Sequence, residues 1–305
     1  METLAQSEPE FVTLWVSNVL ALIHEPGFGM SKRARSNGTR AMARRQSEGR
    51  GQGKGKDYKP WLMIHDVPSL GLATRMKSPL NGRTYHLMSQ LEADWLYAFH
   101  ALPALCDVRE QFPLFDLEET LEIASNLCVS HPADPGTKEP CVVTTDFVLN
   151  FKNGPNQTEM AIAVKPSAEL SSLRILEKLE IERCYWSARN VPWQILTEKE
   201  LPRAIVKNLR WIYPHIDLVQ AGTFTAAEVV RIRSALEHDL ESGRQSLVDV
   251  TTACDDRLGL KPGAALCVAR HLIGIGAWPI DLTVEIDPRK PLFLINTGGR
   301  QDAAR

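Results

Sequence analysis

The chain has 305 residues, of which 44% are hydrophobic, 24% charged and 7% aromatic. These fractions are close to the average of globular proteins, and the length suits about two domains, so collagen-like, coiled-coil and wholly disordered chains are excluded. The longest apolar stretch, 14–23, is interrupted by Ser17 and Asn18 and is shorter than a bilayer-spanning helix requires. The first ten residues carry glutamates where a secretory leader would be basic. We therefore expect a cytoplasmic protein that does not associate with membranes.

The net charge of −2 conceals a strongly basic segment near the start of the chain. Residues 31–60 contain ten Lys and Arg against two acids, which gives this segment a charge of +8 and the rest of the chain −10. Because the segment is also rich in Gly and Ser, we expect a flexible arm that follows a polyanion such as the backbone of a nucleic acid. A solvated tail without a partner is the alternative. The candidate DNA contacts are Arg44, Arg45, Arg50, Lys54 and Lys56.

The next segment, 86–102, is predicted to be a helix because its apolar residues recur at helical spacing. Ser89 followed three residues later by Glu92 has the form of a capping box. A helical projection nevertheless places Glu92 inside the apolar stripe, where an unpaired carboxylate is costly to bury. Glu92 therefore either caps the helix or faces a cation in a cleft, and this segment leaves both possibilities open.

Strands and a second helix are predicted further along the chain. After a short strand at 108–112, residues 142–151 alternate as a strand with Asp146 at its centre, and a Gly-Pro turn leads to a strand at 160–165 that ends with Lys165. A helix over 168–189 has Glu182 at the edge of its apolar face, and a strand over 191–197 follows. This order of elements would allow a sheet to bring Glu92, Asp146 and Lys165 together.

Two acids and a lysine suit the hydrolysis of a phosphodiester bond. Mg²⁺ prefers carboxylate and carbonyl oxygens, polarises the phosphate and lowers the pKa of a bound water. A lysine beside it can orient that water or stabilise the charged transition state. Asp146 and Lys165 alone are a weak signal, because many proteins carry an Asp and a Lys on adjacent strands.

A series of collinear motifs carries more information than this spacing. They are Ala43-Arg44-Arg45 with EGRGQGKGKDY at 48–58, DVPS at 66–69, REQFPL at 109–114, TTDF at 144–147, VKP at 164–166, LEKLEIER at 176–183 and TEKE at 197–200. In this order the motifs resemble the TnsA family, whose members are the endonuclease subunits of heteromeric cut-and-paste transposases. The resemblance extends from about residue 43 to residue 200.

The resemblance implies an α/β (α+β) fold of the restriction-endonuclease type, with a PD-(D/E)xK core, and a DNA nuclease that uses Mg²⁺, for which Mn²⁺ can substitute. Carried over by position, Glu92 and Asp146 are expected to bind the metal, and Lys165 is the expected catalytic lysine. The main-chain carbonyl of Val164 is expected to be a further metal ligand. Glu182 matches an acid in the family's following helix and is a possible accessory acid.

One position departs from the family pattern. Two residues before the lysine, restriction enzymes have Glu or Asp and TnsA relatives have Gln, whereas this chain has Ala163. A methyl group cannot bind a metal, so a backbone carbonyl, a water or Glu182 covers this coordination position, or the site is weakened. We expect the first outcome. The alternative is a catalytically weakened subunit that binds DNA and assembles the transposition complex.

The last third of the chain is predicted to be mainly helical. A capping box at Thr225 and Glu228 precedes one helix, and a helix at 246–257, a Gly-containing turn and a helix at 264–273 follow. Apolar segments at 278–286 and 291–295 could pair as a wing, which would give a winged-helix-like domain. Because few bases are available for DNA contacts, protein docking is at least as well supported as DNA recognition. The candidate bases are Lys261, Arg270 and His271.

These patterns divide the chain into an N-terminal extension with the basic arm (1–57), a catalytic domain (58–201) and a winged-helix-like domain (202–305). By the resemblance, the protein cuts the 5′, non-transferred strand at transposon ends and acts with the transposase TnsB and the ATP-dependent regulator TnsC. A self-sufficient restriction-type nuclease is a third interpretation and the least favoured. The sequence leaves open the end sequence recognised, the targeting pathway, the stoichiometry, and whether Met1 or Met30 is the true start.

Overall fold

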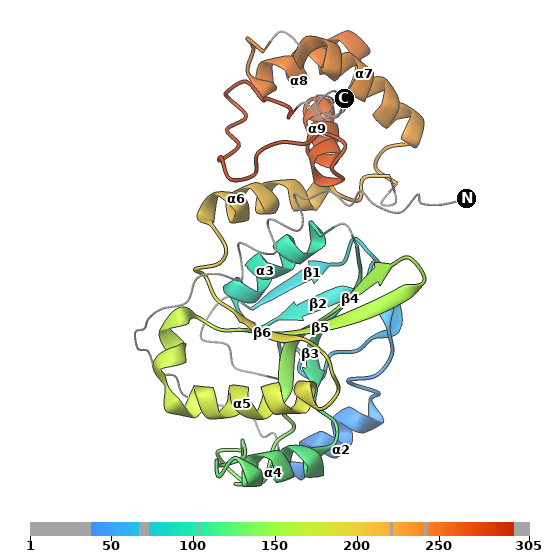
Figure 1. Ribbon diagram of the computed structural model, residues 1–305. Coiled ribbons are helices and arrows are strands. Elements are labelled where there is room, and N and C mark those ends of the chain that lie inside the picture. The colour runs from blue at the N-terminus through green and yellow to red at the C-terminus, as the bar shows by residue number, and fades with distance from the viewer. Residues whose placement is uncertain (1–37, 67–72, 103, 220–221, 241–242, 296–305) are drawn as a thin grey trace, which may run out of the picture. The chain divides into compact units, whose positions relative to one another are not determined.

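A computed structural model describes residues 38–66, 73–102, 104–219, 222–240 and 243–295 (Figure 1). The chain divides between Leu201 and Pro202 into two compact units. Residues 1–37, which include both candidate start positions and the first part of the basic segment, lie outside the described residues, as do motif residues 67–69. Among the helices of the described part, none is long and apolar enough to cross a membrane.

A four-stranded sheet forms the centre of the first unit. Its spatial order is β3-β4-β5-β6, with antiparallel pairing between β3, β4 and β5 and parallel pairing between β5 and β6. A separate antiparallel hairpin is formed by β1 and β2. The strands are β1 (Thr74–Lys77), β2 (Thr84–Leu87), β3 (Leu105–Pro113), β4 (Thr144–Asn153), β5 (Asn156–Val164) and β6 (Trp193–Leu196).

Helices α3 (Gln90–His100) and α5 (Leu173–Ser187) lie on opposite sides of this sheet (Figure 1). On the α3 side, the rings of Phe99 and Phe147 meet edge to face, with centroids 5.3 Å apart. On the α5 side, Trp186 donates a hydrogen bond from Nε1 to Thr145 Oγ1 at 2.7 Å. Each helix buries its apolar face against one side of the sheet.

The order of elements predicted for residues 86–197 is confirmed. The helix, the three strands, the second helix and the last strand all form, although the helix predicted from residue 168 begins with a 3-10 turn, Ser167–Ser171, and Lys165 lies just beyond β5. The sequence analysis missed the short β1–β2 hairpin and helix α4 (Leu117–Asn126). The mixed α/β architecture agrees with the expected fold class.

The expectation of a flexible basic arm is wrong from residue 38 onward. Residues Thr39–Ser47 form helix α2, and a 3-10 turn, Gly55–Asp57, follows. Arg45 is buried with its guanidinium over the ring of Trp61, 5.7 Å from the centroid. The chain then approaches β3 so closely that a Cβ on Gly51, whose φ is +75°, would overlap Pro113. Glycine permits this packing and the left-handed backbone, so here it does not indicate disorder.

The second unit is a helical bundle around one apolar core. Its helices are α6 (Arg203–Ile212), the 3-10 turn η3 (Tyr213–His215), α7 (Ala226–Leu240), α8 (Leu247–Leu258) and α9 (Ala264–Gly274). The core is formed by the facing sides of these helices and by Trp278. The turn between α8 and α9 is fixed by Asp255, whose carboxylate accepts hydrogen bonds from the backbone N–H groups of Gly263 at 2.7 Å and Ala265 at 2.8 Å.

The predicted wing is not formed by the described residues 275–295, which contain no strand. Prolines at 279, 288 and 291 remove backbone donors that a ladder needs. Three backbone groups of this segment instead bond to a helix: Asn208 of α6 donates to the carbonyls of Leu282 and Val284 and accepts from the N–H of Ile286. One backbone bond, from the N–H of Ile295 to the carbonyl of Pro279 at 2.8 Å, joins the two predicted wing segments without forming a strand pair. The helical part of the prediction is therefore confirmed, and its β-wing is wrong.

Candidate active site

Asp146 and Lys165 meet where β4 and β5 adjoin. Lys165 Nζ lies 2.6 Å from Asp146 Oδ2 and also donates to the carbonyl oxygen of Val164 at 3.1 Å. The backbone N–H of Val164 donates to the same Asp146 oxygen at 2.7 Å. The three residues predicted on neighbouring strands are thus brought together, with the lysine ammonium placed on the two oxygens expected to bind a metal.

Glu92 belongs to the same cluster and also caps helix α3. Its backbone N–H donates to Ser89 Oγ at 3.1 Å, and its carboxylate accepts from Ser89 Oγ at 3.0 Å and from the N–H of Met88 at 2.8 Å. Burial and the negative charge of Asp146 raise the pKa of Glu92 to about 7. The two interpretations left open by the sequence are therefore compatible, because the cap holds a carboxylate within the electrostatic reach of Asp146.

Glu182 reaches the cluster from helix α5. Its side chain is buried, and Oε1 accepts a hydrogen bond from Trp193 Nε1 at 2.9 Å. Burial and the charge of Asp146 raise the pKa of Glu182 to about 7 as well. Burial opposes the charge of Lys165, but the Asp146 carboxylate raises the pKa of this lysine well above its usual value. The site therefore places Lys165 in contact with Asp146, and the carboxyl groups of Glu92 and Glu182 lie within electrostatic reach of both.

This donor set suits a hard divalent cation. Carboxylate and carbonyl oxygens are the ligands that Mg²⁺ prefers, and the ammonium of Lys165 already bridges one of each. In the described part of the chain, however, no group of three or more His, Cys, Asp or Glu side chains is arranged closely enough to hold a metal. A cation at Asp146 would therefore need oxygens beyond the carboxylates, and the carbonyl of Val164 is one of them.

Gln111 is a site residue that the sequence analysis missed. It lies in β3, is buried, and its Nε2 is 3.5 Å from Glu92 Oε2, while Thr144 Oγ1 lies 3.4 Å from its Oε1. The residue was present in the REQFPL motif, but only as part of a resemblance. Asp107, Arg109 and Glu110 in the same strand are also polar and buried, so no local pattern distinguished Gln111 from its neighbours.

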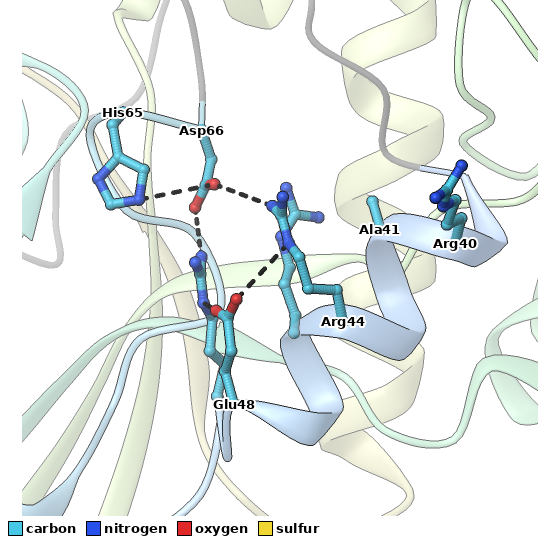
Figure 2. Close-up of a pocket in the computed structure, with 8 residues that line it drawn as sticks. Arg40, Ala41, Arg44, Glu48, His65 and Asp66 are labelled. Atoms are coloured by element: carbon cyan, nitrogen blue, oxygen red, sulfur yellow. Dashed lines mark hydrogen bonds and ion pairs between the residues drawn. The ribbon is translucent and has the colours of Figure 1, made fainter.

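A second polar region is a pocket of about 820 Å³ beside helix α2 (Figure 2). Asp66 is at its centre: Arg50 bonds directly to this carboxylate, Arg44 Nη2 lies 3.7 Å from it, and the N–H of Met63 donates to it at 2.9 Å. Arg50 is also 2.6 Å from Glu48. The pocket is lined by Arg40, Ala41, Arg44, Arg45, Glu48, Arg50, His65 and Asp66.

The five predicted DNA contacts separate into two groups in this structure. Arg45 and Arg50 are buried and serve packing and ion pairing, so they are poorly placed to follow a DNA backbone. Arg44, Lys54 and Lys56 are exposed and able to meet a polyanion. Arg44 also lies 3.6 Å from Glu48 and 3.7 Å from Asp66, so Lys54 and Lys56 are the better placed of the exposed bases to contact DNA.

Two of the three candidate bases in the second unit are engaged in its packing. The Arg270 guanidinium stacks over Trp211, 4.6 Å from the ring centroid, and bonds to its carbonyl. His271 is buried, with Nδ1 near the carbonyls of His215 and Ile216. Lys261 is exposed. Arg270 and His271 are therefore poorly placed to contact DNA.

Comparison with known proteins identifies the family of this chain. Residues 103–198 match the family model described as "TnsA-like endonuclease N terminal", and residues 200–282 match "TnsA endonuclease C terminal". The first match includes Asp146, Val164, Lys165 and Glu182, whereas Glu92 precedes it. The chain is 39% identical over 236 residues to the transposon Tn7 transposition protein TnsA of Escherichia coli, covering 77% of this chain and 83% of that protein. The chain belongs to the TnsA endonuclease family.

Proposed function

We propose that this protein is the metal-dependent DNA endonuclease subunit of a heteromeric cut-and-paste transposase. It hydrolyses the 5′, non-transferred strand at transposon ends, while TnsB cuts and joins the other strand and TnsC regulates both. The observation that carries the proposal is the contact of Lys165 with Asp146 and Val164 O at the junction of two strands. The sheet of the first unit is then the PD-(D/E)xK core, with Glu92 and Asp146 as metal-binding acids.

The chemistry assigned to each residue follows from charge and position. Mg²⁺ bound at Asp146, Glu92 and the Val164 carbonyl would polarise the phosphate and lower the pKa of a bound water. Lys165 acts as a cation and not as a base, because Asp146 keeps its ammonium protonated. Its N–H groups orient the attacking water or stabilise the negative charge of the transition state. The α3 cap fixes the Glu92 carboxylate in the site.

The exposed bases near α2 supply the DNA-binding part of the proposal. Arg44, Lys54 and Lys56 project from the same unit as the site, where they can bind phosphates without reading sequence. Each such contact releases counterions and makes binding dependent on salt. The second unit, in this proposal, docks TnsB and TnsC, because two of its three candidate bases are taken up by packing.

One observation favours a second candidate function. Ala163, two residues before Lys165, is buried and offers no side-chain oxygen. A subunit that keeps the fold and the basic surface but binds metal poorly would serve in assembly without cutting. This is the catalytically weakened alternative, and it differs from the first proposal in metal binding and strand cleavage only.

Cleavage of strand-labelled transposon-end DNA separates the two functions. The end is incubated with TnsB, TnsC and target DNA in Mg²⁺ or in EDTA, with either the unmodified protein or Asp146→Asn. We expect the 5′ strand to be cut only by the unmodified protein and only in Mg²⁺, because the variant lacks one of the carboxylates proposed to bind the metal. Glu122→Gln, which changes an exposed acid of α4, is the matched control and should cut normally.

The contrary results are equally clear. If the unmodified protein leaves the 5′ strand intact while TnsB still nicks its own strand, the assembly function replaces the nuclease. If Asp146→Asn cuts at the normal rate, the site is elsewhere. Cleavage of arbitrary DNA without partners would instead support a self-sufficient restriction-type nuclease.

A further inference from the structure

Gln111 has an unusual backbone for a strand residue. Its φ is +48°, in the left-handed region that disfavours side chains other than glycine. Among the described non-glycine residues with positive φ, the other three lie in turns or loops, whereas Gln111 lies within β3. Such strain persists only where the surroundings hold it, and it is concentrated at functional sites. The carbonyl of Gln111 is held by the N–H of Trp61 at 3.1 Å.

This conformation reverses the faces of β3. Glu110 accepts a hydrogen bond from the N–H of His86 in β2, and its pairing partner Phe147 packs on α3. Phe112, two residues later, instead packs against Trp186 of α5, at a centroid distance of 5.6 Å. Residues two apart share a face in a regular strand, so the change takes place at Gln111.

The neighbouring strand reverses at the same level. Phe147 contacts Phe99 of α3, whereas Thr145 accepts a hydrogen bond from Trp186 of α5. Because Glu110 pairs with Phe147 and Phe112 with Thr145, Gln111 is the residue opposite Asp146. The strained residue and the central acid of the candidate site therefore occupy the same level of two adjacent strands.

The Gln111 amide lies loosely among groups of the site. Its contacts with Glu92 at 3.5 Å and Thr144 at 3.4 Å are at the outer limit of hydrogen bonding. The amide oxygen and nitrogen exchange places by rotation of the terminal torsion, so either can face Glu92. Glu182, by contrast, is held by a good hydrogen bond from Trp193 at 2.9 Å. The Gln111 amide is therefore less tightly held than Glu182 Oε1 and can turn its oxygen toward a cation.

We propose that Gln111 is a further metal-binding residue, whose amide oxygen supplies the ligand that the methyl group of Ala163 cannot. An uncharged carbonyl oxygen is a suitable ligand for Mg²⁺ and adds no negative charge to a cluster that already holds three carboxyl groups. The strained backbone places this oxygen, which a regular β3 would direct elsewhere. The inference rests on the proposed function, because it assigns a ligand to the metal of that site.

Mn²⁺ binding to the purified full-length protein, measured by calorimetry and by electron paramagnetic resonance, tests this role without DNA or activity. Gln111→Gly removes the ligand and relieves the backbone strain, so we expect about tenfold weaker Mn²⁺ binding with no loss of thermal stability. Gln111→Glu keeps an oxygen at the same position and should bind Mn²⁺ at least as tightly as the unmodified protein. Thr144→Val is the matched control for loss of the neighbouring contact and should bind normally.

Three other results of the Mn²⁺ binding experiment would contradict the proposal in different ways. If Gln111→Gly binds Mn²⁺ normally while Asp146→Asn does not, Gln111 is not a ligand and the proposed metal site stands. If Gln111→Gly weakens binding but Gln111→Glu does not restore it, Gln111 only positions Glu92, and the ligand role is rejected. If the unmodified protein itself binds no Mn²⁺, the proposed metal-dependent function fails along with this inference.

Discussion

Two of the places where the first unit buries charge are balanced differently. Beside α2, the carboxylate of Asp66 is matched by Arg50 directly and by Arg44 at 3.7 Å. At the sheet, Asp146, Glu92 and Glu182 are all buried, and Lys165 is the cation that contacts Asp146 and whose charge acts on both glutamates. Acids therefore have enough positive partners in the first cluster and too few in the second.

The pKa values record this difference. Burial by itself would raise the pKa of Asp66, but the Met63 N–H and the Arg50 guanidinium hold it below its usual value. At the sheet, burial and the charge of Asp146 raise the pKa values of Glu92 and Glu182 to about 7. A buried charge that is matched supports the fold, whereas a surplus of one sign indicates a site prepared for a ligand of the other sign.

The largest effect is expected from removing the Asp66 carboxylate, which lies at the centre of the cluster beside α2. Asp66→Ala leaves Arg50 buried without its main partner, which should lower the free energy of unfolding by about 3 kcal/mol. The effect also depends on pH. Because the folded pKa of Asp66 is depressed, its stabilisation is present above about pH 5 and is lost as pH falls through the folded value. The difference between the two proteins in urea unfolding should therefore shrink in acid.

Glu122→Gln provides a control for this measurement, because Glu122 is an exposed acid of α4. It should unfold with the unmodified protein at every pH. An Asp66→Ala protein as stable as the unmodified one at neutral pH would show that the cluster beside α2 is not a structural element.

A smaller effect on stability is expected at the cluster of acids at the sheet, formed by Asp146, Glu92 and Glu182. Glu182→Gln removes a buried negative charge but keeps an oxygen that accepts the Trp193 hydrogen bond. We expect the free energy of unfolding near pH 8 to stay the same or rise by about 1 kcal/mol, because desolvating the carboxylate is no longer required. Cleavage of the 5′ strand in the complete transposition reaction should nevertheless fall.

Stability and strand cleavage, measured on the same Glu182→Gln protein, show whether Glu182 is a structural charge or part of the site. A Glu182→Gln protein that is clearly less stable would place Glu182 with Asp66 among structural charges. One that is stable and cuts at the full rate would rule Glu182 out as an accessory acid.

The parts of the molecule that the sequence predicted well are those governed by local patterns. The helix with Glu92 and the strands with Asp146 and Lys165 follow from apolar periodicity, and each residue lies where its element places it. The contact between Asp146 and Lys165 needed only adjacent strands, which the short turn after β4 provides.

The remaining features depend on contacts between distant residues. The basic segment has a flexible composition, yet Asp66 and the ring of Trp61 fix its arginines, and Gly51 packs against Pro113 of β3. The wing was expected from two apolar runs, but Asn208 takes up their backbone groups. The position of Gln111 depends on its positive φ, which the periodicity of the sequence does not predict. In each case the deciding partner lies far along the chain.

The smallest expected effect concerns the exposed bases of the same basic segment. Lys54→Ala with Lys56→Ala removes two exposed ammonium groups while leaving the buried Arg50 in place. If these lysines bind phosphates, DNA binding weakens by a similar factor for every sequence, and the slope of log affinity against log salt falls by about 2. Titration of fluorescent duplex DNA at several salt concentrations measures both quantities.

Lys290→Ala, which changes an exposed lysine of the second unit, serves as the control. An unchanged salt slope in the double variant would mean that neither Lys54 nor Lys56 binds phosphates.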